Sequence, residues 1–178
     1  MSLLIALQMD ALTRLNFRTD STLYLARRAL WHGHRLFHYE PAHMRLVIEN
    51  GAAKVLAAGH ELVFNEQAEK RWSLGAVETI DLTTCDVILM RQDPPFDLAY
   101  ITATHMLDHI KLKVRVVNDP TGVRDAPEKL LLTHFPQLMP PTLITRDQKA
   151  IESFRAQHGD IIIKPLYSHG GRGVFHIA

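Results

Sequence analysis

The chain of 178 residues has little cysteine, little net charge and no long apolar run. Its one cysteine, Cys85, cannot form a disulfide within the chain, so we expect a reducing compartment. Acidic and basic residues nearly cancel at a formal charge of +1, which provides no bulk attraction to nucleic acid. The apolar runs are too short to span a bilayer, and the N-terminus lacks the pattern of a signal peptide. We therefore expect a cytoplasmic protein with no nucleic-acid or membrane partner.

What the sequence does have is an alternation of apolar strand patterns with amphipathic helix patterns over its first two thirds. Asp20 and Ser21 are candidate N-caps for the first helix, and Gly33 follows its end. Strands that alternate with helices predict an α/β fold with a parallel sheet. The expected strands are 3–9, 34–41, 86–90 and 114–118, and the expected helices are 20–32 and 98–110.

Two further regions carry strand signals. Asn50-Gly51 lies between two β-prone runs and predicts a tight hairpin, because a type I′ turn needs positive φ at both central positions. From residue 123 onward the pattern is less regular and predicts an α+β domain. Its expected elements are a helix at 127–134, a strand after Pro140-Pro141, a helix at 147–157, a strand at 161–164 and a last strand at 174–178.

The segment DIIIKPLYSHGGRGVF is a candidate phosphate-binding loop. Gly170, Gly171 and Gly173 would let backbone N–H groups approach an anion, and Lys164 would add a charge at the end of a buried strand. A buried lysine needs an anionic partner, whereas a lysine that reaches the surface does not. The order of residues differs from a P-loop, in which the lysine follows the glycines. A simple glycine-rich turn is the alternative.

Arg91 and Lys129 are two more candidate anion ligands. Arg91 ends the strand at 86–90, at the carboxyl edge where open α/β sheets bind ligands, and its guanidinium suits a carboxylate. The alternative is an ion pair with Asp93 or Asp97. Lys129 lies near an expected helix start, where a solvated lysine is the alternative.

The histidines and the cysteine do not predict a metal site. His105 and His109 are one helical turn apart, but the glutamate of HExxH and a third ligand are missing. Cys85 has no basic neighbour that would activate its thiol, so we expect a buried, unreactive group.

Six segments in order make the pattern much more specific: MD after the first strand, DSTLYL, DVILMRQDPPFD, VVNDPTGVRDAPEKLL, PPTLITRD and DIIIKPLYSHGGRGVF. Together they resemble the bacterial glutathione synthetases, which are ligases of the ATP-grasp superfamily. The resemblance runs from residue 3 to residue 178. It implies a pre-ATP-grasp, Rossmann-like domain at 1–122 and an incomplete ATP-grasp domain at 123–178.

The resemblance also implies the chemistry and the site residues. The family joins γ-glutamylcysteine to glycine with ATP and Mg²⁺, through an acyl phosphate. Lys129 and Lys164 match the lysines that contact the nucleotide phosphates, and Gly170, Gly171 and Gly173 match a mobile loop over them. The RQDPPFD segment, with Arg91, and the Asp20-Ser21 helix start match the side that faces the dipeptide. His169 and Arg172 depart from the small or amide residues that are common in this loop.

The family continues well beyond residue 178, and the Mg²⁺ ligands, the adenine site and the glycine site are expected there. We therefore expect the N-terminal part of a ligase that forms homo-oligomers, inactive as this chain alone. One alternative is a non-catalytic module that binds γ-glutamylcysteine or glutathione. Another is an ATP-grasp ligase for a different carboxylate and amine.

Overall fold

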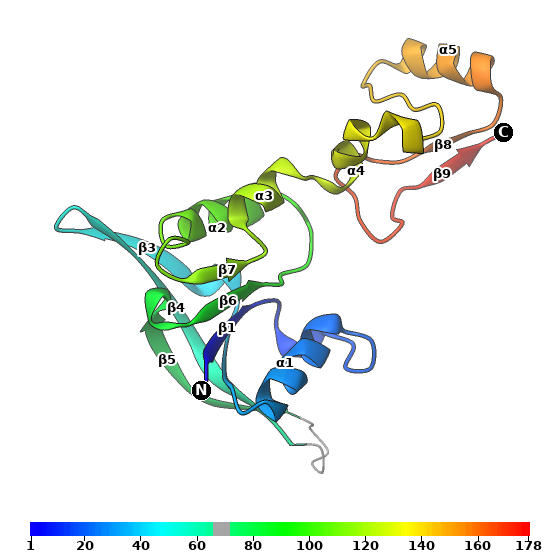
Figure 1. Ribbon diagram of the computed structural model, residues 1–178. Coiled ribbons are helices and arrows are strands. Elements are labelled where there is room, and N and C mark those ends of the chain that lie inside the picture. The colour runs from blue at the N-terminus through cyan, green and yellow to red at the C-terminus, as the bar shows by residue number, and fades with distance from the viewer. Residues whose placement is uncertain (66–71) are drawn as a thin grey trace. The chain divides into compact units, whose positions relative to one another are not determined.

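The computed structural model describes residues 1–65 and 72–178 (Figure 1). The chain divides into two compact units, Met1–Arg124 and Asp125–Ala178. Seven strands of the first unit form one sheet, and two strands of the second unit form another.

The sheet of the first unit is mixed. Strands β2, β1, β6 and β7 lie in that order and are all parallel, as the alternation of strands and helices predicts. Strands β3, β4 and β5 pair in antiparallel fashion, so the sheet is mixed and the predicted parallel sheet accounts only for the other four strands. The strands are β1 (Leu4–Gln8), β2 (Arg35–Tyr39), β3 (Met44–Glu49), β4 (Ala52–Phe64), β5 (Trp72–Asp81), β6 (Val87–Met90) and β7 (Arg115–Val117).

The long strand β4 joins the two parts of this sheet. Leu56 pairs with Arg45 of β3 and with Asp81 of β5, and His60 pairs with His38 of β2 and with Val77 of β5. Since a strand residue has one neighbour on each side, β2 and β3 follow one another along one edge of β4, and β5 covers the other edge. Local periodicity carries no information about this shared edge, which is why the sequence did not predict it.

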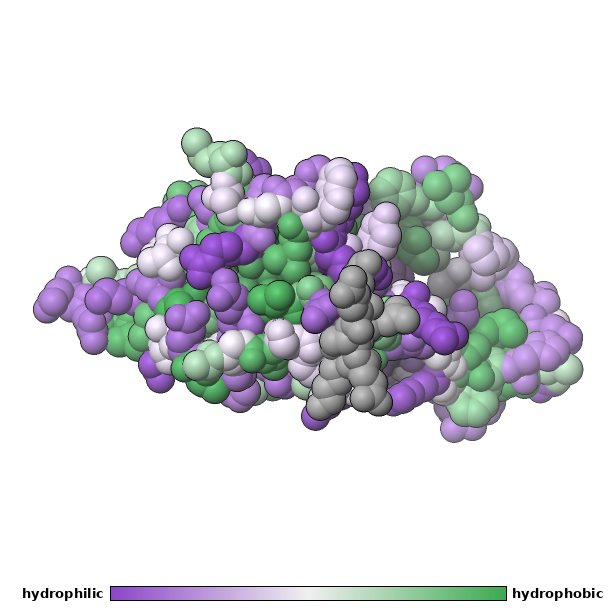
Figure 2. Space-filling view, turned by 90° about the horizontal axis from the view of Figure 1, so that it is seen from below, coloured by the Kyte–Doolittle hydropathy of each residue, from purple (hydrophilic) through white to green (hydrophobic). Residues whose placement is uncertain are grey.

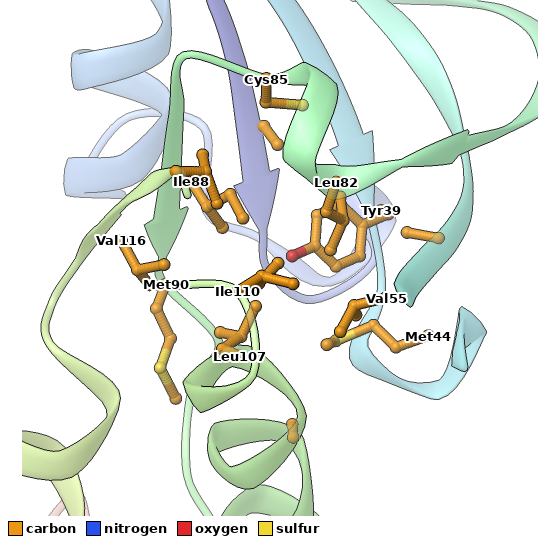
Figure 3. Packing of buried hydrophobic residues seen from close by; sticks show 14 of the residues in the cluster. Tyr39, Met44, Val55, Leu82, Cys85, Ile88, Met90, Leu107, Ile110 and Val116 are labelled. Atoms are coloured by element: carbon orange, nitrogen blue, oxygen red, sulfur yellow. The ribbon is translucent and has the colours of Figure 1, made fainter. Parts of the chain in front are cut away.

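Helices α1 (Ser21–Trp31) and α2 (Leu98–Asp108) confirm the two helices that the sequence predicts in this unit. Leu23 and Ala26 of α1 pack in one core cluster with Leu7 of β1. Leu107 of α2 packs in the other cluster, which also contains Tyr39 and Ile88 (Figure 3). Side chains alternate along a strand, so neighbouring residues of β1 and β6 enter different clusters. A short helix, α3 (Pro120–Asp125), follows β7.

The Asn50-Gly51 turn confirms the predicted hairpin. Both residues have positive φ, 51° and 73°, and the strands on either side pair in register from Glu49–Ala52 outward. This is the geometry of a type I′ turn, in which asparagine and glycine are the favoured residues.

The second unit contains α4 (Glu128–Leu131), α5 (Gln148–His158) and the antiparallel pair β8 (Ile161–Ile163) and β9 (Phe175–Ile177). A 3-10 turn, Leu132–His134, extends α4 over the range that the sequence predicts. The strand predicted after Pro140-Pro141 is wrong, because residues 139–147 form no strand. A strand requires a partner for its backbone groups, and this segment has none within the described residues.

The face of the molecule seen in Figure 2 mixes hydrophilic and hydrophobic residues, as the composition leads one to expect. Among the described helices, none combines the length and apolar character that a membrane crossing needs.

Candidate functional site

The carboxyl ends of β1 and β6 meet the N-terminus of α1 around Arg91. The backbone N–H of Arg91 donates to the Gln8 carbonyl oxygen at 2.7 Å, which continues the pairing of the two strands by one residue. Its side chain donates from Nε to Thr22 Oγ1 at 3.1 Å and from Nη2 to Ser21 Oγ at 2.8 Å. The structure thus brings together Arg91 and Ser21, which are 70 residues apart and were both predicted as site residues.

These two hydrogen bonds orient the guanidinium and leave part of it free. A guanidinium has five N–H donors in a planar fork. The hydroxyls occupy one donor on Nε and one on Nη2, so the edge formed by Nη1 and Nη2 keeps its donors for a ligand carboxylate. Within residues 1–65 and 72–178, Arg91 forms no ion pair with Asp93 or Asp97.

Asp20 is the N-cap of α1, as the sequence predicts. Its carboxylate accepts a hydrogen bond from the backbone N–H of Leu23 at 2.8 Å. This bond satisfies one of the free N–H groups at the helix start, and caps of this kind contribute roughly 1 kcal/mol. Within the described residues, Asp20 therefore supports the helix end that presents Ser21 and Thr22 to Arg91.

Two carboxylates lie at the same edge: Asp93, which is part of the RQDPPFD segment that the resemblance assigns to the dipeptide side, and Asp10, which was not predicted as a site residue. The backbone N–H of Asp93 donates to Asp10 Oδ2 at 2.7 Å, which joins the loop after β1 to the loop after β6. Burial raises the pKa of Tyr100, the nearby Arg91 charge lowers that pKa, and Asp93 and Asp10 raise it. All three charges therefore lie within electrostatic reach of Tyr100. An acid placed just after each of two neighbouring parallel strands is the signal that could have identified the pair.

His38 supports Asp10 from the end of β2. His38 Nε2 lies 3.2 Å from the Asp10 carbonyl oxygen, so Nε2 carries the proton and donates. Its other ring nitrogen, Nδ1, is the one buried side-chain polar atom of the described residues that lacks a hydrogen-bond partner. Burial lowers the pKa of His38, and a neutral ring fits both observations.

The glycine loop of the second unit connects β8 to β9. Gly170, Gly171 and Gly173 all have positive φ, between 59° and 74°. A Cβ on Gly173 would lie 2.8 Å from Pro165 Cγ, so this position excludes a side chain by contact as well as by conformation.

Lys129 reaches this loop from α4. Its ammonium donates a hydrogen bond to the Ser168 carbonyl oxygen, and its side chain is only 21% exposed. The Ser168 hydroxyl in turn donates to the Arg172 carbonyl oxygen at 2.6 Å. Lys129 and the loop, both selected from the sequence as candidate anion ligands, therefore lie together.

Lys164 lies directly after β8, where the sequence predicts it, but the strand is less buried than expected. It follows β8 but is exposed, and β8 itself is only partly covered, with Ile162 53% exposed. The expectation of a cation at the end of a buried strand is wrong for this unit, because a two-stranded sheet covers one side of so short a strand at best. No hydrogen bond or ion pair joins the Lys164 side chain to another described residue.

Cys85 and His105, which the sequence analysis considered as reactive or metal-binding residues, have other contacts in the structure. Cys85 is buried in a core cluster, and burial, followed by the charges of Asp86 and Asp81, raises its pKa to about 12. His105 Nδ1 lies 4.0 Å from Asp108 Oδ2 on the same helix. Over residues 1–65 and 72–178, no three histidine, cysteine or acidic side chains form a group that could hold a metal ion.

The chain thus combines a mixed α/β unit with a second unit in which a lysine holds a glycine-rich loop. Two family models match it: "Prokaryotic glutathione synthetase, N-terminal domain" over residues 3–124, and "Prokaryotic glutathione synthetase, ATP-grasp domain" over residues 128–178. The chain belongs to the prokaryotic glutathione synthetase family.

Several curated relatives carry the name glutathione synthetase. The one from Agrobacterium fabrum is 48% identical over 174 residues, which cover 98% of this chain and 53% of the relative. The one from Brucella melitensis is 47% identical over all of this chain and 56% of the relative. The one from Vibrio cholerae is 38% identical over 95% and 52%, respectively. This chain thus spans about half the length of the curated relatives it matches.

Proposed function

We propose that this chain is the N-terminal part of an ATP-dependent ligase that joins γ-glutamylcysteine to glycine and forms glutathione. The observation that carries the proposal is the match of both units, over residues 3–124 and 128–178, to the two domains of one ligase family. The reaction passes through an acyl phosphate. The cysteinyl carboxylate attacks the γ-phosphorus of ATP and ADP leaves; the glycine amine then attacks the acyl carbon, loses a proton and expels phosphate.

The dipeptide site lies at the carboxyl edge of the first unit, in this proposal. The free edge of Arg91 pairs with a carboxylate, and Asp10 and Asp93 offer negative charge to an ammonium group. One cation beside two carboxylates matches an amino-acid group, which carries both charges, and the γ-glutamyl end of the dipeptide has such a group. In this proposal, the parallel strands β2, β1, β6 and β7 are the Rossmann-like part of the domain.

The nucleotide phosphates are assigned to the second unit. Lys129 and Lys164 supply positive charge, and the backbone N–H groups around Gly170, Gly171 and Gly173 supply hydrogen bonds. Phosphoryl transfer depends mainly on positioning and charge neutralisation, which these groups provide. Mg²⁺ would neutralise further charge, but the described residues do not form a site for it, so its ligands are assigned to the rest of the protein.

The working protein is proposed to be a cytoplasmic homo-oligomer. The support for the compartment is the single, buried cysteine, which fits a reducing environment. The support for the oligomer is the resemblance to the family.

The test is ADP release by the full-length protein. We expect release only when γ-glutamylcysteine, glycine and Mg-ATP are all present, and loss of release in Lys164→Ala. Lys113→Ala, which removes another exposed lysine, is the matched control and is expected to keep the wild-type rate. Release that does not depend on the dipeptide or on glycine would overturn the ligase assignment. An unchanged rate in Lys164→Ala would remove the role given to Lys164.

A further inference from the structure

We propose that Gln92 is a specificity residue for the dipeptide: its amide N–H group donates to an uncharged oxygen of the substrate, the γ-glutamyl amide carbonyl, and Gln8 and Tyr39 hold it in that orientation. The proposal rests on the proposed function for the identity of the ligand. It is carried by a chain of hydrogen bonds that links the core to the carboxyl edge of the sheet.

The chain begins at Tyr39, in the interior. Its ring lies among Met44, Val55 and Leu82 (Figure 3) and is 1% exposed. Its hydroxyl donates to Gln8 Oε1 at 3.0 Å, and this is the one hydrogen bond that the hydroxyl forms within the described residues. Burial raises the pKa of Tyr39, so the hydroxyl keeps its proton and remains a donor.

The hydroxyl determines the orientation of the Gln8 amide. Gln8 is fully buried at the last position of β1, where both ends of its amide need partners. With Oε1 turned to Tyr39, Nε2 must point the other way, and it donates to Gln92 Oε1. If the amide of Gln8 were reversed, the Tyr39 proton would have no acceptor, which is costly in a buried site.

The hydrogen bond from Gln8 also determines the orientation of the Gln92 amide. Its Oε1 accepts from Gln8, so its Nε2 group points away from the core. Gln92 Nε2 makes no hydrogen bond to another described residue, yet it is not among the buried unpartnered atoms of those residues. Gln92 therefore presents two N–H donors that solvent or a ligand can reach.

Gln92 and Arg91 approach the carboxyl edge from opposite faces of the sheet. Arg91 donates to Ser21 and Thr22 of α1, whereas Gln92 contacts Gln8, on the face that carries Tyr39. A ligand across this edge would meet a cation on one side and a neutral amide on the other. Asp93 follows Gln92 and adds negative charge nearby, so a second carboxylate is disfavoured there and a carbonyl oxygen is favoured.

The first variant is Gln92→Glu in the full-length protein. A carboxylate has nearly the same shape, and one of its oxygens can still accept from Gln8, so the change keeps that bond and replaces the outward donor with a negatively charged acceptor. We expect the KM for γ-glutamylcysteine to rise about tenfold, the scale for a buried polar group left without its partner, with kcat and the KM for ATP within about twofold. Gln157→Glu, the same substitution on the exposed face of α5, is the matched control.

The second variant tests the orientation from a distance. Tyr39→Phe removes the hydroxyl that fixes Gln8, so both amides can reverse, and we expect a rise of about threefold in the same KM. Tyr24→Phe, at an exposed position of α1, is its control. Thermal unfolding establishes that each variant is folded. An unchanged dipeptide KM in Gln92→Glu, or an equal rise in the ATP KM, would overturn the proposal.

Direct binding separates this proposal from the proposed function. Calorimetric titration of the full-length protein with γ-glutamylcysteine requires no turnover. If the wild-type protein binds the dipeptide but releases no ADP, the ligase assignment fails, and an about tenfold weaker Kd in Gln92→Glu still supports the role of Gln92. Equal Kd values for the wild type and Gln92→Glu would overturn it, whether or not the protein is a ligase.

Discussion

Arg91 shows how much of the site depends on the geometry of one side chain. Its Nε–Nη2 edge bonds to two hydroxyls of α1, and its Nη1–Nη2 edge remains for a ligand. Lysine would keep the charge, but a single ammonium cannot hold two hydroxyls and a carboxylate in one plane. We expect Arg91→Lys to raise the KM for γ-glutamylcysteine at least about tenfold, since a charge-assisted bond contributes about 1.5–3 kcal/mol.

The control for this substitution is Arg115→Lys, at an exposed position of β7. Initial rates at varied dipeptide concentration measure both proteins. Equal KM values for Arg91→Lys and the wild type would show that the fork geometry has no role.

His38 makes the stability of the first unit depend on pH. Burial lowers its pKa from 6.5 in the folded protein, while Glu40 raises that pKa and the nearby His60 and His43 lower it. In the unfolded chain the ring binds a proton near pH 6.5, so the unfolded state gains more from acid than the folded state does. The contribution of His38 to stability is present above pH 6.5 and is lost as the pH falls through the folded-state pKa.

Urea unfolding between pH 8 and pH 5 measures this effect. We expect the free energy of unfolding to fall less steeply with acid in His38→Gln than in the wild type. The exposed His109→Gln, which removes a histidine that does not act on His38, is expected to keep the wild-type slope. A wild-type slope in His38→Gln would contradict the buried neutral ring.

At the scale of elements, two glycines of the loop separate the effect of a steric contact from the effect of a left-handed backbone conformation. Gly173 and Gly171 have nearly the same φ, 69° and 74°, but only Gly173 faces Pro165 closely enough to exclude a Cβ. An alanine at either position costs about 1–2 kcal/mol for the left-handed conformation. At Gly173 the contact with Pro165 adds to this cost and displaces the loop.

We therefore expect Gly173→Ala to raise the KM for ATP in the full-length protein more than Gly171→Ala does. Steady-state rates at varied ATP concentration measure the difference. Equal effects of the two substitutions would mean that the contact between Gly173 and Pro165 does not position the loop.

The sequence predicted those elements whose signals lie within a few adjacent residues. The cap at Asp20, the turn at Asn50-Gly51 and the helix α5 were all evident from a few adjacent residues. The strand expected after Pro140-Pro141 failed because apolar residues alone do not supply a pairing partner. No element was predicted within residues 60–80, where the structure has the end of β4 and most of β5; residues 66–71 lie outside the described residues.

At the scale of the molecule, the buried core belongs almost entirely to the first unit. Both core clusters consist of residues between Ile5 and Val116, and Ile161 is the single buried apolar residue described in the second unit. Burial of apolar surface is the main favourable contribution to folding. We expect residues 1–124 to fold cooperatively when expressed alone, and residues 125–178 alone to show no cooperative transition.

Thermal unfolding followed by circular dichroism measures both segments. The intact 178-residue chain is the control and should show the transition of the first segment. A sharp transition in residues 125–178 alone would contradict this account, and so would its absence in residues 1–124.

The sequence by itself determined the local elements and the family resemblance, because caps, turns and motif order depend on neighbouring residues. The tertiary structure alone decided which distant residues meet. Gln8 contacts Gln92 across 84 residues, and Lys129 reaches Ser168 across 39. It also decided that β4 is shared by three strands, which makes the sheet mixed. Such pairings depend on backbone hydrogen bonds and core packing summed over the whole unit, and no local pattern in the sequence specifies that sum.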